Sequence, residues 1–62
     1  MEELDIWRAA NQMIVEHGGE ARLEAMKLAA KMLERGHLEG YEVWALIWAA
    51  IKVLQEKAAM AN

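Results

Sequence analysis

Side chains that could hold a metal ion or move a proton are few and scattered in this sequence. Glu34 and His37 have the Glu-x-x-His spacing that puts two metal ligands on one helix face in di-iron bundles. Gly36 lies between them and is expected to end the helix, and the chain holds no second copy of the pair. The pattern therefore indicates a solvated helix end, and we expect no metal site.

Nucleophiles and cofactor motifs are missing as well. Serine, threonine and cysteine are absent, which removes the usual nucleophiles, disulfides and thiolate metal ligands. His17, with Glu16 and Glu20 nearby, fits a helix C-terminus, where the helix dipole favours positive charge, better than a proton shuttle. No phosphate-binding or zinc motif is found. We expect a non-enzymatic protein with no catalytic residue and no cofactor, and a cytoplasmic chain is the simplest fit to this composition.

Charge and hydropathy narrow the choice of partners. The net charge is −3 and the seven Lys and Arg residues form no block, so no nucleic-acid footprint is expected. The acidic start, with Glu2, Glu3 and Asp5, is unlike a secretory signal. The apolar run Val43–Ile51 is shorter than the roughly 20 residues that span a bilayer. An interfacial membrane helix would favour a basic polar face, so a membrane partner is not expected.

Helical spacing of apolar residues predicts one all-α domain over residues 1–62. Three helices are expected at about 3–17, 20–35 and 39–60, separated by Gly18-Gly19 and by Gly36. Short breaks favour an antiparallel, up-down three-helix bundle. The residues expected in its intrachain core are Ile6, Trp7, Ala10, Ile14, Leu28, Met32, Val43, Ile47, Ala50 and Leu54.

Asn11 is a polar residue within the apolar arc of the first helix. It fits a boundary residue bonded to water or backbone. A second interpretation is a buried polar residue that sets helix register or pairing, as a single core asparagine can do. The residues alone leave both interpretations open.

The third helix is apolar on every side between Val43 and Ile51, and such a helix must be buried on every side. Two short neighbouring helices cannot cover all of it, and a domain near 60 residues is marginal alone. We therefore expect self-association through the third helix, with a two-fold homodimer as the commonest closed form. The interface residues expected are Trp44, Trp48, Ile51, Leu46, Val53 and Gln55.

Other functions are compatible with the same pattern. A protein–protein interaction module with a further partner is one extension of the homodimer. A small-molecule-binding bundle with an apolar pocket near Trp44 and Trp48 is an alternative, because the tryptophans could line a ligand site. An engineered or designed helical scaffold would show the same features.

Several short segments carry a resemblance to a known group of proteins. They include Asp5-Ile6-Trp7-Arg8-Ala9-Ala10, His17-Gly18, Leu33-Glu34-Arg35-Gly36, Leu38-Glu39-Gly40 and Val43-Trp44. With these, the chain resembles short uncharacterised bacterial proteins, alphaproteobacterial in type, of an all-helical domain-of-unknown-function family. The resemblance implies a three-helix unit and no assigned activity. The chain departs from that family at His37, where an aspartate is usual, and at Ala45–Trp48, where charge is usual.

Overall fold

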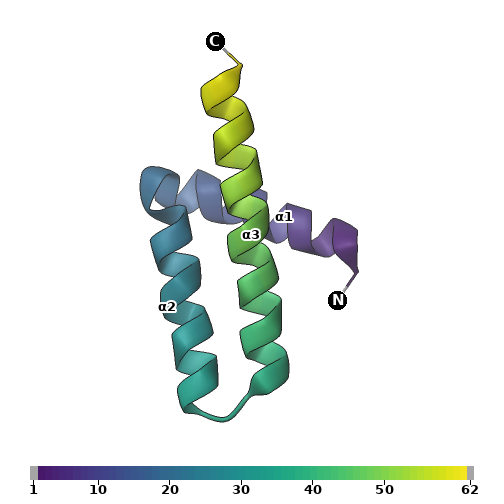
Figure 1. Ribbon diagram of the computed structural model, residues 1–62, viewed down its shortest axis with the longest axis vertical. Coiled ribbons are helices and arrows are strands. Elements are labelled where there is room, and N and C mark those ends of the chain that lie inside the picture. Colours follow the sequence, from purple (N-terminus) through teal and green to yellow (C-terminus); the bar gives the residue numbers. More distant parts are fainter. Residues whose placement is uncertain (1, 62) are drawn as a thin grey trace.

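A computed structural model describes residues 2–61 and shows an all-helical chain (Figure 1). Its elements are α1 (Glu3–His17), the short 3-10 helix η1 (Gly18–Glu20), α2 (Ala21–Glu34) and α3 (Leu38–Met60). The all-α class is confirmed. The helix count differs from the expected three, because the Gly18-Gly19 break forms a helical turn of its own.

The end of α2 shows why the chain turns where it does. Gly36 has a φ of +73°, a conformation that glycine adopts without steric cost. Its N–H donates to the carbonyl of Leu33 (3.0 Å), and the N–H of His37 donates to the carbonyl of Met32 (2.8 Å). These two bonds form a Schellman motif, which satisfies carbonyls that the helix end leaves free. The sequence signal at Gly36 therefore marks the helix end correctly.

The helices do not form an up-down bundle. α2 and α3 run antiparallel as a hairpin, while α1 lies across their back (Figure 1). The expectation that α1 runs alongside the other two is wrong. The connection is direct, since η1 follows α1 and α2 follows η1, and the chain changes direction there without an extended loop.

The α2–α3 hairpin closes tightly at its lower end. A Cβ built on Gly40 would lie 2.8 Å from the Sδ atom of Met32. Glycine at this position therefore lets the first turn of α3 lie against the thioether of Met32, which is half-buried there. α3 packs most extensively against α2, and α1 crosses it on another side.

The core is small and rich in alanine. The only large side chains that are fully buried among the described residues are Ile47 and Ile51. The buried residues of α2 are all alanines, which lets the helices approach closely. The buried residues are Ile6, Ala10, Met13, Ala21, Ala25, Ala29, Ile47, Ala50 and Ile51.

The predicted core residues fall into two groups, one buried and one half-buried. Ile6, Ala10, Ile47 and Ala50 are buried. Six others are half-buried: Trp7, Ile14, Leu28, Met32, Val43 and Leu54. All of these except Met32 pack against the buried cluster. Asn11 is exposed on α1, and no polar side chain of the described residues is buried. The interpretation of Asn11 as a buried register-setting residue is therefore wrong within this chain.

Gln55 ties α3 to the turn between α1 and α2. Its Nε2 atom donates to the carbonyl oxygen of Gly18 at 3.0 Å, across 37 residues of sequence. The side chain is half-buried within the chain, and its assignment to an oligomer interface stays a prediction. The cause is the crossing of α1, which brings Gly18 beside the upper part of α3.

Replacing Gln55 with alanine is expected to lower the free energy of unfolding by about 1 kcal/mol, because this hydrogen bond is lost. Gln12 supplies a matched control, since its Nε2 atom bonds only the exposed Glu16 side chain on the same helix. Gln12→Ala should change stability by less than about 0.5 kcal/mol. Urea unfolding of both variants measures the difference. Equal midpoints would show that the Gln55 bond does not hold the helices together.

Candidate functional site

The most prominent surface feature is an apolar strip on the side of α3 that neither α1 nor α2 covers. We call it the outer α3 face, and it consists of Ala45, Leu46, Trp48, Ala49 and Val53. Leu46 is 56% exposed and Val53 is 41% exposed, and Ala49 is exposed between them. Trp48 is half-buried at its other edge, and Ala45, which is also half-buried, lies one turn from Ala49 along the middle of the face. The face therefore has two small alanine side chains along its middle and larger apolar side chains on both sides of them.

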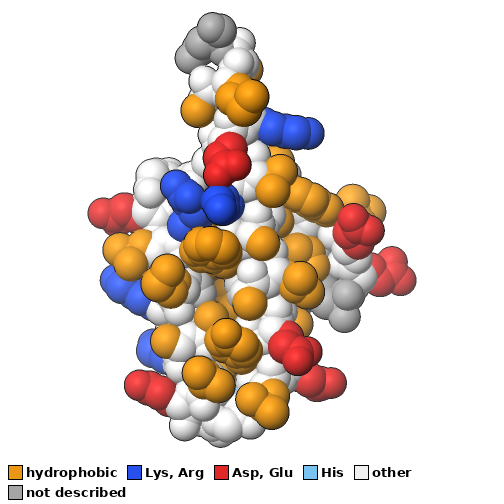
Figure 2. All heavy atoms as spheres, in the orientation of Figure 1, with side chains coloured by type: hydrophobic (Ala, Val, Ile, Leu, Met, Phe, Trp, Pro, Cys, Tyr) orange, Lys and Arg blue, Asp and Glu red, His pale blue; other side chains and the backbone are white. Residues whose placement is uncertain are grey.

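The apolar surface continues from α3 onto α2. Figure 2 shows hydrophobic side chains gathered over α2 and the middle of α3, on the face turned away from α1. An open groove of about 270 Å³ runs between the two helices here. Its lining residues are Met26, Ala29, Ala30, Leu33, Tyr41, Ala45 and Trp48. Met26 and Leu33 are about half exposed, so this groove widens the apolar strip.

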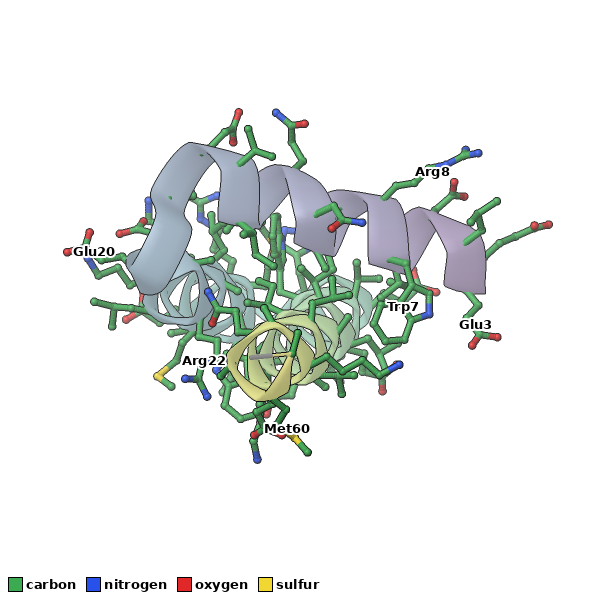
Figure 3. All side chains as sticks on the ribbon, turned by 90° about the horizontal axis from the view of Figure 1, so that it is seen from above. Glu3, Trp7, Arg8, Glu20, Arg22 and Met60 are labelled. Atoms are coloured by element: carbon green, nitrogen blue, oxygen red, sulfur yellow. The ribbon has the colours of Figure 1, made fainter. Side chains whose placement is uncertain are left out.

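A second groove lies between α1 and α3, at the opposite edge of the outer α3 face. It has a volume of about 490 Å³ and is lined by Glu3, Ile6, Trp7, Leu46, Ala49, Ala50 and Val53. Figure 3 shows Trp7 and Glu3 on the side of α1 nearer α3, with Arg8 on the opposite side. The carboxylate of Glu3 is its only charged lining group. Both grooves are shallow and open, so neither provides the enclosed cavity that a catalytic site uses to exclude water.

Charged residues bound the outer α3 face at its two ends. Glu42 lies one turn before Ala45, and Lys52 lies one turn after Ala49. The Nζ atom of Lys52 lies 4.0 Å from an Oε atom of Glu56 and 5.8 Å from the centroid of the Trp48 ring. All three charged side chains are exposed. A partner on this face would therefore meet a negative group at one end and a positive group near the other.

The structure sorts the predicted interface residues into two groups. Leu46 and Val53 lie on the outer α3 face, with Trp48 at its edge. Ile51 has no exposed surface and belongs to the core, so its assignment to the interface is corrected. Trp44 and Trp48 are both half-buried and pack against the same core, so each offers a partner less surface than was expected. The reason is that α3 packs against both α2 and α1, and Ile51 lies in the core that the three helices share.

Ala49 is an exposed residue of the outer α3 face that the predicted interface set did not include. It lies three residues after Leu46 and four before Val53, which is the spacing of one helical stripe. A search for interaction surfaces among large apolar side chains passes over a residue as small as alanine. The stripe spacing was the available signal.

The candidate metal and membrane features are also placed by the structure. Glu34 and His37 are exposed on either side of the α2–α3 turn, and no cluster of three metal-ligating side chains occurs within residues 2–61. None of the helices described has the length and hydropathy needed to cross a bilayer. The groove nearest Trp44 is lined by Glu39 and Glu42 as well as apolar side chains.

Comparison of the chain with protein-family models, with curated proteins and with solved structures finds no match. The resemblance to short bacterial helical proteins therefore stays a prediction, and function must be argued from this surface alone.

Proposed function

We propose that this protein is a non-enzymatic helical module that forms a homodimer through the outer α3 face. The observation that carries the proposal is the exposure of Leu46 and Val53 beside Ala49 on the helix that forms the centre of the fold. These side chains belong to one continuous strip, and continuous apolar strips on small proteins usually mark interaction sites.

The small core supports this proposal. Five of its nine buried residues are alanines, and each alanine removes little apolar surface from water. Among the described residues, ten large hydrophobic side chains remain exposed, from Leu4 to Met60. A typical specific interface covers about 800 Å² per partner, which is about one sixth of the 4625 Å² surface of this chain. A second copy would therefore add a large share to the apolar area that folding buries.

The experiment that tests the proposal places a charge at the centre of the strip. Ala49→Glu is expected to weaken dimerisation by about two orders of magnitude, because association would bury an unpaired carboxylate from each copy. Helicity should be unchanged, since Ala49 is exposed in the single chain. Sedimentation velocity and far-ultraviolet circular dichroism measure the two properties.

Ala58→Glu is the matched control. Ala58 is exposed on the same helix but lies outside the outer α3 face, so this variant should keep the mass of the wild type. If Ala49→Glu also keeps that mass, association uses another surface and the proposal is wrong.

A further inference from the structure

The spacing of residues along the outer α3 face has a symmetry that specifies how a second copy would lie. Ala45 and Ala49 are one turn apart at the centre of the strip. Glu42 precedes Ala45 by three residues, and Lys52 follows Ala49 by three residues. The four residues, in the order acid, alanine, alanine and base, are therefore placed symmetrically about the midpoint between the two alanines.

A two-fold axis through that midpoint would pair each position with its counterpart. Two antiparallel copies of α3 would place Ala45 in the same layer as Ala49 of the second copy, and Glu42 in the same layer as Lys52 of the second copy. The two alanine layers allow the helix axes to approach at the short end of the usual 8–10 Å range. The two outer layers then each contain one carboxylate and one ammonium group.

The edges of the strip agree with this arrangement. In an antiparallel pair, like edges of the two helices meet on the same side of the seam. Leu46 and Val53 form one edge, and Tyr41 and Trp48 form the other; all four are apolar or aromatic and at least partly exposed. Each edge would therefore bury apolar surface against its own copy.

A parallel pair would behave differently. It would place Glu42 opposite Glu42 and Lys52 opposite Lys52, and like charges in one layer oppose association. α1 does not obstruct the antiparallel pair, because it lies on the back of the hairpin (Figure 1).

We infer that the second copy packs its α3 antiparallel across Ala45 and Ala49, with Glu42 of each copy facing Lys52 of the other. This inference rests on the proposed function, since it specifies the geometry of the same interface. It adds an orientation, a register and two intermolecular ion pairs.

A charge swap tests the inference. Glu42→Lys and Lys52→Glu should each raise the dimer dissociation constant about tenfold, because each creates two like-charge layers in place of two ion pairs. The double variant carrying both changes should recover most of the lost affinity, although Lys52→Glu also replaces the contact with Glu56 of the same copy by a like-charge pair. Sedimentation equilibrium at low ionic strength provides the four values, and the recovery should shrink as salt screens the pairs.

Cysteine cross-linking supplies a second readout that does not depend on the strength of the ion pairs. The chain has no cysteine, so single variants carry one thiol each. Under mild oxidation, a mixture of Glu42→Cys and Lys52→Cys proteins should form a mixed disulfide dimer, whereas each variant alone should form little.

The outcomes separate the two proposals. If the wild type dimerises but the double variant stays weakened, and each cysteine variant links to itself, the antiparallel register is wrong while self-association stands. If the wild type sediments as a monomer, the proposed function is wrong and this inference is wrong with it.

Discussion

Ile51→Ala is expected to lower the free energy of unfolding by about 2–5 kcal/mol, the usual cost of truncating a buried isoleucine. Ile51 has no exposed surface and is one of two large side chains fully buried in the described chain. At 0.05–0.15 kcal/mol per residue, the whole domain has roughly 3–9 kcal/mol of stability. The truncation should therefore remove a large share of that stability, and circular dichroism during urea titration should show a clearly lower midpoint.

Val53→Ala is the matched control for Ile51→Ala. Val53 is on the same helix two residues away, but it is 41% exposed. Its truncation should cost the single chain less than about 1 kcal/mol and act mainly on association. If Ile51→Ala gave a fully folded monomer instead, Ile51 would belong to an interface between copies and the core described above would be wrong.

Ala25→Leu is expected to destabilise the fold by about 1–3 kcal/mol or more, through overpacking. Ala25 has no exposed surface and lies in the α2 stripe Ala21, Ala25, Ala29 that faces the interior. Extra methylene groups there would push α2 away from α3. Thermal unfolding should show a lower midpoint and lower cooperativity.

Ala30→Leu tests whether the stability lost in Ala25→Leu comes from crowding between α2 and α3. Ala30 is on the same helix and is exposed beside the α2–α3 groove, so this change should alter stability by less than about 0.5 kcal/mol. A variant Ala25→Leu as stable as Ala30→Leu would show that α2 does not pack closely through its alanines.

Local sequence signals predicted the helices well. Glycine at positions 18 and 36 and the spacing of apolar residues placed the helix ends within one or two residues of those in the structure. These signals are local, because a helix end depends on the backbone conformation and hydrogen bonds of a few neighbouring residues. They carry no information about how one helix crosses another.

The sequence could not reveal the direction in which α1 crosses the other helices. This direction affects which residues of α3 stay exposed to solvent. In the expected up-down bundle, Ile51 and Gln55 were assigned to a partner. With α1 across the back, Ile51 is enclosed by the chain itself and Gln55 reaches Gly18. The candidate site therefore keeps Leu46 and Val53 from the prediction, adds Ala49 between them and loses Ile51.

Self-association is the central claim, and the molar mass of the wild-type chain in solution tests it most directly. Sedimentation equilibrium at tens of micromolar should give twice the chain mass of 7.0 kDa, with dissociation on dilution if the interface is of modest strength. A helical, cooperatively folding species of 7.0 kDa across the same concentrations would contradict the claim, because the outer α3 face would then be stable in water without a second copy.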